Sequence, residues 1–176
     1  RKPTDVYVEL EQMGIRDISM EVTTSDWNDM YAESMELVQL FESATIKLPM
    51  TVDGLKVCRM LPDHVRTNVT LVFNAAQALL VAEAGATYVS PFVGRIDDQG
   101  YAGIEVVRSI CELYKRQNLD TQVLAASIRS PHRVVRSFYN GADVVTMPPN
   151  VFWQMYNHVL TDQGLQIFEK AYAAIG

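Results

Sequence analysis

The sequence contains little that would suggest a secreted, membrane-bound or nucleic-acid-binding protein. Only two cysteines occur, Cys58 and Cys111, and both lie in helical patterns far apart in the chain. A disulfide framework is therefore not expected, and a reducing compartment such as the cytoplasm fits better. No run of about 18 apolar residues could form a membrane span, and no apolar signal-peptide core follows the first five residues. The net charge of −6 argues against a general nucleic-acid binder, which needs a basic face.

Signatures of nucleotide and metal binding are also lacking. Neither a P-loop nor a GxGxxG motif is present. The three histidines, His64, His132 and His158, do not have the spacing of metal ligands. The adjacent Asp97 and Asp98 fit a helix cap better than a metal site, because neighbouring side chains point apart. We therefore expect neither a metal nor a cofactor.

What the sequence does contain is a regular alternation of short β-rich runs with helical patterns. Gly85 and Gly141 each follow a helical pattern and precede a strand, where a glycine commonly ends a helix. We expect strands at 17–22, 45–48, 67–73, 87–92, 122–127 and 143–147, and helices at 4–13, 26–41, 52–61, 75–84, 103–117, 131–140, 151–158 and 162–174. This alternation predicts an α/β fold with a parallel sheet and crossover helices.

The order of the expected elements fits a (β/α)8 TIM barrel, but the number of strands is too small. Such a barrel needs about 200 residues or more, and only six strands are visible in these 176 residues, which begin with a helical pattern. We therefore expect one domain over residues 1–176, with the first two strands of the barrel absent from the chain.

Lys47 is the strongest candidate for a chemical role. It lies in the expected strand Ala44-Thr45-Ile46-Lys47-Leu48-Pro49. Because side chains alternate along a strand, Ile46 and Leu48 should face the helices while Lys47 faces the barrel interior. Removal from water favours the neutral amine, which can attack a carbonyl. The plainer alternative is a lysine near a strand end that reaches solvent.

Several other polar or aromatic residues lie in the expected strands or just after them, and catalytic groups of (β/α) barrels lie at the carboxyl ends of strands. Taken singly, each has a plainer explanation. Glu21 could be an exposed glutamate, Thr70 could reflect β-propensity, and Arg95 and Arg129 could be surface arginines, although guanidinium groups also suit phosphate. The pattern is more informative than any member, and its other members are Asn68, Ser90, Phe92 and Ser127.

These residues lie in segments that resemble the small transaldolases and fructose-6-phosphate aldolases, which are class I, Schiff-base enzymes of sugar metabolism. The resemblance covers nearly the whole chain. Its most specific parts are IKLPMT at 46–51, NVTLVF at 68–73, AAQA at 75–78, YVSPFVGRID at 88–97, AASIR at 125–129 and GADVVTMP at 141–148.

The resemblance implies a role for each candidate. Lys47 would form the Schiff base, and Glu21 and Thr70 would hold a catalytic water. Asn68, Ser90 and Ser127 would line the sugar site, while Arg95 and Arg129 would bind the terminal phosphate. At the position of Phe92, transaldolase-like members carry phenylalanine and aldolase-like members carry tyrosine. At the position of Glu21, transaldolase-like members favour glutamate and aldolase-like members favour glutamine.

The resemblance also implies a (β/α)8 barrel that acts on sugar phosphates as a homo-oligomer, a pentamer or decamer, whose C-terminal helix packs on a neighbour. The family's first strand carries an acid/base aspartate, and its second ends in a Thr-Thr-Asn-Pro-like motif. Neither segment occurs here, so the chain either lacks its N-terminus or is a fragment. The expected activity is transfer of a dihydroxyacetone unit. Release of dihydroxyacetone, action on a sulfonated ketose and a non-enzymatic barrel are the alternatives.

Overall fold

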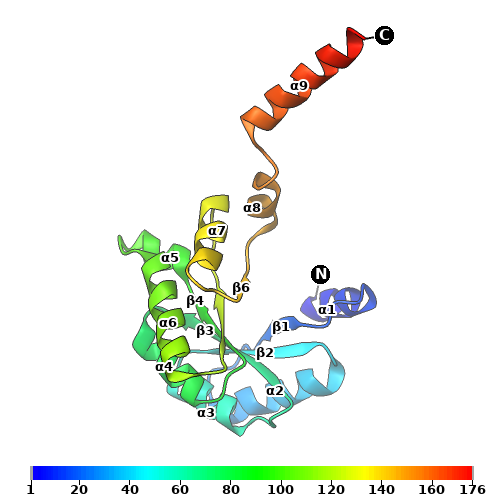
Figure 1. The fold of residues 1–176 in the computed structure, drawn as a ribbon. Coiled ribbons are helices and arrows are strands. Elements are labelled where there is room, and N and C mark those ends of the chain that lie inside the picture. The colour runs from blue at the N-terminus through cyan, green and yellow to red at the C-terminus, as the bar shows by residue number, and fades with distance from the viewer. Residues whose placement is uncertain (1, 176) are drawn as a thin grey trace.

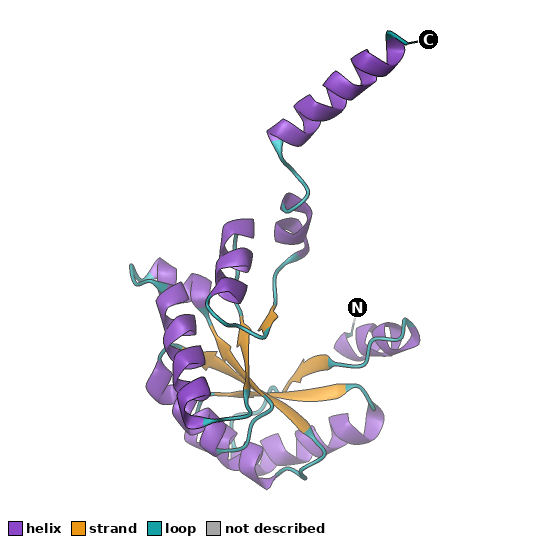
Figure 2. Cartoon of the chain, in the orientation of Figure 1, coloured by secondary structure: helices purple, strands orange, loops and turns teal. Residues whose placement is uncertain are grey.

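The computed structural model describes residues 2–175, so Arg1 and Gly176, the ends of the expected domain, lie outside it. Six parallel strands form one sheet in sequential order (Figure 1). They are β1 (Ile18–Glu21), β2 (Ala44–Pro49), β3 (Arg66–Val72), β4 (Tyr88–Pro91), β5 (Gln122–Ala125) and β6 (Val144–Val145). The sheet is curled, and helices cover its outer face (Figure 2). The expected α/β fold is thus confirmed as a TIM-barrel-like fold with six strands among the described residues.

One helix precedes the first strand, and most of the others lie at the positions expected from the sequence. The helices are α1 (Pro3–Gln12), α2 (Trp27–Leu40), α3 (Val52–Met60), α4 (Ala75–Glu83), α5 (Val93–Asp98), α6 (Gly103–Gln117), α7 (Pro131–Tyr139), α8 (Pro149–Gln154) and α9 (Val159–Ala173). Five of them begin at a side chain that accepts a hydrogen bond from a backbone amide of the first turn: Asp26, Thr51, Asn74, Ser130 and His158. Each cap satisfies an otherwise unpaired amide and so sets where its helix starts.

The core lies between the outer face of the sheet and these helices. Ile46 and Leu48 of β2 are completely buried, as are Met20 of β1 and Val69 of β3. Polar side chains alternate with these apolar ones, so they face the interior of the curled sheet. The burial of the outward face therefore fixes which side chains can line an interior pocket.

One helix, α5, was not expected from the sequence. It has only six residues and lies between the end of β4 and α6. Its first amides donate to carbonyls of a neighbouring loop, from Val93 to Ala126 and from Gly94 to Ser127, both at 3.0 Å. Contacts between distant segments stabilise this helix, which explains why a local sequence pattern did not indicate it.

The C-terminal boundaries also differ from expectation. The last expected strand is reduced to Val144–Val145. Helix α8 begins and ends earlier than predicted, and α9 begins at Val159 because His158 caps it by accepting a hydrogen bond from the amide of Leu160.

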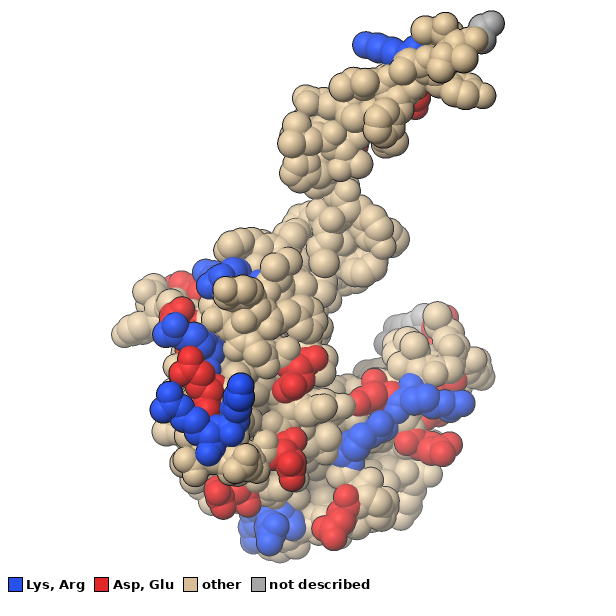
Figure 3. Space-filling model, in the orientation of Figure 1, with Lys and Arg blue, Asp and Glu red and all other residues tan. Residues whose placement is uncertain are grey.

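Helices α8 and α9 form an arm that projects from the sheet and its helices (Figure 1). No residue of α9 is buried, although Leu160, Ile167, Phe168 and Tyr172 are large and apolar or aromatic. Figure 3 shows few charged atoms on the visible face of the arm. Within residues 2–175, no helix is both long and apolar enough to cross a membrane.

Candidate active site

A pocket of about 490 Å³ opens on the inner face of the sheet, and it contains most of the residues singled out from the sequence. Strands β1 to β5 present side chains to it, and the segments that follow β4, β5 and β6 complete its rim. The residues that line it are Tyr7, Ser19, Glu21, Lys47, Asn68, Ser90, Phe92, Leu124, Ala126, Ser127 and Thr146. Six of the nine predicted site residues therefore lie around one cavity.

Lys47 points into this pocket from the middle of β2. The parallel register places Glu21 of β1 and Asn68 of β3 directly beside it. The Lys47 Nζ donates a hydrogen bond to the Glu21 carboxylate at 2.9 Å, and the lysine side chain is 23% exposed against 54% for the glutamate. This contact holds the Lys47 amine beside the Glu21 carboxylate. The carboxylate is also within reach to accept its proton.

Asn68 connects two hydroxyl groups across the floor of the pocket. Its amide nitrogen donates to Ser19 at 3.1 Å, and its amide oxygen accepts from Ser90 at 2.6 Å. Asn68 and Ser90 are almost fully buried. Because both ends of the amide are bonded, the side chain is held in one orientation next to Lys47.

Thr70 lies deeper than the alternation of β3 suggests. Its side chain is fully buried and does not line the pocket, and its hydroxyl has no hydrogen-bond partner within residues 2–175. The pairing of β3 with β4 is irregular between Val69 and Val72, and Leu71 has a φ of 61°. A buried hydroxyl without a protein partner is a site at which water commonly binds.

Phe92 forms one wall of the pocket. Its ring packs edge-on against Phe73, with the ring centres 6.0 Å apart, and the guanidinium carbon of Arg95 lies 5.1 Å from its centre. Such a contact between a cation and an aromatic face is attractive. Arg95 is thereby held behind Phe92 and is not among the residues that line the pocket.

Arg129 is likewise outside the pocket lining, but it lies close to the rim. Its Nη1 donates to the carboxylate of Asp98 at the end of α5. That hydrogen bond raises the pKa of Arg129 further above its ordinary value. The two predicted phosphate-binding arginines are therefore near the pocket, one behind an aromatic ring and one paired with a carboxylate.

Several lining residues were not predicted from the sequence. Ser19 could have been predicted from the alternation of side chains along the strand, since it is two residues before Glu21 and lies on the same face. Thr146 follows β6, where a polar residue at a strand end is a usable signal. Tyr7 lies on α1, and no local pattern in the sequence indicates that this helix reaches the pocket.

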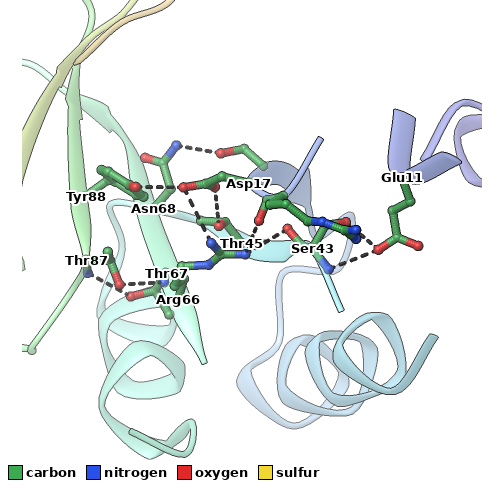
Figure 4. A network of polar contacts seen from close by, with 11 residues as sticks. Glu11, Asp17, Ser43, Thr45, Arg66, Thr67, Asn68, Thr87 and Tyr88 are labelled. Atoms are coloured by element: carbon green, nitrogen blue, oxygen red, sulfur yellow. Dashed lines mark hydrogen bonds and ion pairs between the residues drawn. The ribbon is translucent and has the colours of Figure 1, made fainter. Parts of the chain in front are cut away.

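A second polar network lies at the opposite, amino ends of the strands (Figure 4). Asp17 accepts hydrogen bonds from Thr45 and from the Tyr88 hydroxyl, the latter at 2.7 Å, and lies 3.8 Å from Arg66. The hydrogen bond to Asp17 raises the pKa of Tyr88. Because these groups have partners within the network, we interpret it as structural: it joins the segment before β1 to the amino ends of β2, β3 and β4.

No group of three or more His, Cys, Asp or Glu side chains in residues 2–175 is arranged to hold a metal ion. Both cysteines are free. Burial raises the pKa of the Cys58 thiol, and it raises that of Cys111 to about 12. Asp97 does act as a cap, since it accepts a hydrogen bond from the amide of Gly103 at the start of α6, whereas Asp98 pairs with Arg129.

Solved structures support the fold alone. The chain is similar to GMP reductase from Trypanosoma brucei, with a TM-score of 0.57 at 15% identity. A second structure of that protein gives a TM-score of 0.55 at 14% identity. The match covers 77% of this chain but only 30% of the first reductase chain, so this chain spans less than a third of its length.

Sequence comparisons are far more specific. The chain is 47% identical over 152 residues to a probable transaldolase of Geobacillus kaustophilus, a match that covers 86% of this chain and 71% of the relative. It is 45% identical over 157 residues to a probable transaldolase of Brachyspira hyodysenteriae, with 89% and 72% covered. The family model described as transaldolase/fructose-6-phosphate aldolase matches residues 5–175. The chain therefore belongs to the transaldolase/fructose-6-phosphate aldolase family of enzymes.

Proposed function

We propose that the protein is a transaldolase, which transfers a dihydroxyacetone unit between sugar phosphates through a Schiff base on Lys47. The observation that carries this proposal is the position of Lys47. It is the only lysine that lines the pocket among the described residues, and it lies beside a carboxylate and an oriented amide. An amine nucleophile with an adjacent proton acceptor is the arrangement that covalent catalysis on a ketone needs.

The reaction begins with loss of a proton from the Lys47 ammonium to Glu21. The free amine attacks the ketose carbonyl at C2, and loss of water gives a protonated imine. The C4 hydroxyl then loses its proton, the C3–C4 bond breaks, and its electron pair flows into the imine. An aldehyde leaves, while a three-carbon enamine remains on Lys47. The enamine carbon attacks the aldehyde of an acceptor sugar, and hydrolysis of the new imine releases the product and restores the amine.

Proton transfer in these steps is assigned to a water held by Glu21 and Thr70. Glu21 reaches Lys47 directly at 2.9 Å, within the range of general acid–base catalysis. The buried hydroxyl of Thr70 has no protein partner within residues 2–175 and can bond such a water.

Substrate binding is assigned to two groups of residues. Asn68, Ser90 and Ser127 offer an amide and two hydroxyls to the sugar hydroxyls. Arg95 and Arg129 are assigned to the terminal phosphate, because a guanidinium offers a fork of donors that matches its oxygens.

Phe92 is the reason to favour transfer over release of dihydroxyacetone. Its ring lines the pocket and has no hydroxyl that could hold a water near the enamine. The packing of Phe73 and Arg95 against this ring keeps it in place. The enamine therefore survives until an acceptor sugar arrives. A fructose-6-phosphate aldolase is the second candidate within the same chemistry, and a sulfonated ketose is an alternative substrate.

We further assign a homo-oligomeric state, a pentamer or decamer, to the protein. The apolar arm formed by α8 and α9 is exposed in the single chain, and contact with a neighbouring copy would remove its apolar surface from water. Light scattering of the purified protein tests this assignment, and a monomer would contradict it.

Replacement of the lysine tests the activity. Lys47→Met should abolish transfer of dihydroxyacetone from fructose 6-phosphate to erythrose 4-phosphate, because no amine remains to form the imine. The matched control is Lys56→Met, which removes a lysine of α3 whose Nζ lies over the ring of Trp27. Substantial activity in the Lys47 variant would refute the proposal.

A further inference from the structure

Two neighbouring aspartates at the end of α5 have different environments. Asp97 accepts a hydrogen bond from the amide of Gly103 at 2.9 Å and pairs with Arg133 of α7 at 3.0 Å. Asp98 contacts Arg129 instead, and both of these side chains are about half exposed, 47% and 54%. Asp97 therefore connects α5 to α6 and α7, whereas the carboxylate of Asp98 occupies part of the donor fork of Arg129.

Arg129 lies beside the pocket because α5 and the loop after β5 approach each other closely. A Cβ placed on Gly94 would be 2.8 Å from the Nε of Arg129 and 3.0 Å from the hydroxyl of Ser127. Ser127 itself lines the pocket. The guanidinium that an anionic group on a substrate in the pocket would meet is therefore the one whose Nη1 already donates to Asp98.

We propose that Asp98 is a specificity-determining residue that competes with the substrate's anionic group for Arg129. This inference rests on the proposed function, since it concerns the same pocket. A half-exposed ion pair is weak, whereas a phosphate monoester carries about −1.5 to −2 charges at pH 7 and three acceptor oxygens. Phosphate displaces Asp98, and weaker anions do so less well.

Competition of this kind is confined to one of the two arginines. Arg95 lies against the ring of Phe92 and has no carboxylate partner in the described part of the chain. Asp98 thus lowers the affinity for phosphate at Arg129 alone. The consequence is selectivity for doubly charged groups, together with easier release of a phosphorylated product.

Asp98→Asn tests the proposal with inorganic phosphate as the probe, measured by calorimetry on the complete protein. Removal of the competing charge should tighten phosphate binding about two- to fivefold, the range expected for an exposed ion pair. The KM for fructose 6-phosphate should fall by a similar factor, whereas that for unphosphorylated dihydroxyacetone should not change. Asp98→Glu keeps the negative charge and should therefore bind phosphate as weakly as the wild type does.

Two controls separate competition from other effects. Asp97→Asn removes the same charge from the neighbouring residue but leaves the contact of Asp98 with Arg129 in place, so it should tighten phosphate binding less than Asp98→Asn does. In an Arg129→Ala background, Asp98→Asn should have no effect on phosphate affinity. Equal tightening in the Asp97 variant would show a general charge effect and overturn the proposal.

Unchanged or weaker phosphate binding in Asp98→Asn would also overturn it, and weaker binding would show that Asp98 instead orients Arg129 for the phosphate. Absence of phosphate binding in every variant would contradict an anion site at Arg129. Because calorimetry needs no turnover, these outcomes are distinct from failure of the proposed function, which covalent labelling of Lys47 reports separately.

Discussion

Gly94→Ala should disrupt the junction between α5 and the loop after β5. A Cβ on residue 94 would lie 2.2 Å from the carbonyl oxygen of Ser127, a distance that real Cβ atoms do not show. The contact is with backbone, so a change of side-chain rotamer cannot relieve it. The same carbonyl accepts the hydrogen bond from the Gly94 amide at 3.0 Å, and the two segments must therefore move apart.

The magnitude follows from two contributions. Overpacking of a tight contact costs about 1–3 kcal/mol. The shift also weakens the hydrogen bonds from Val93 and Gly94 to the loop, each of which contributes about 0.5–1.5 kcal/mol. We expect a loss of roughly 2–5 kcal/mol in the free energy of unfolding. A higher KM for phosphorylated sugars should accompany it, because Ser127 and Arg129 move together.

Denaturant-induced unfolding measures the stability, and Gly164→Ala is the matched control. Gly164 lies in α9 with nothing within 4 Å of a Cβ placed on it, and alanine there should gain up to about 1 kcal/mol through helix propensity. If Gly94→Ala is as stable as the wild type and has an unchanged KM, α5 does not approach the backbone of Ser127 as closely as described.

Three further predictions concern Arg129, Phe92 and the polar network around Asp17. Arg129→Ala should raise the KM for phosphorylated sugars about tenfold or more by loss of a charge-assisted contact; steady-state kinetics test this, and an equal loss on unphosphorylated dihydroxyacetone would show a structural role. Phe92→Tyr should increase cleavage of fructose 6-phosphate without acceptor and decrease transfer to erythrose 4-phosphate, and a wild type that already cleaves rapidly alone would support an aldolase. The pKa of Tyr88 is raised in the folded protein by Asp17, so its contribution to stability is present below about pH 10 and lost as pH rises through the raised value. The unfolding temperature should thus fall more steeply at high pH in the wild type than in Tyr88→Phe, and identical profiles would contradict the Asp17 contact.

The interior face of the barrel was predictable because strand periodicity is a strong physical constraint. Ile46 and Leu48 must be buried against helices, and this places Lys47 on the opposite face. The same rule places Asn68 and Ser90 toward the pocket, where the structure connects them by a hydrogen bond. These residues needed only the local pattern of their own strands.

Features that depend on contacts between distant segments could not be predicted. Helix α5 is stabilised by carbonyls of the loop after β5, and the partner of Arg129 is a carboxylate 31 residues earlier in the chain. Tyr7 reaches the pocket from a helix that precedes the first strand. Thr70 follows the alternation of β3 in sequence, but it is fully buried and does not line the pocket, and the pairing of β3 with β4 is irregular at this point.

Reduction of the imine by borohydride tests directly whether Lys47 forms the Schiff base. Treatment of the protein with fructose 6-phosphate and borohydride should convert the Schiff base to a stable secondary amine, which peptide mass spectrometry locates. The label is expected on Lys47, the lysine that contacts Glu21 at 2.9 Å in the pocket. A label on Lys56, or no label in a preparation that catalyses the transfer, would contradict this assignment.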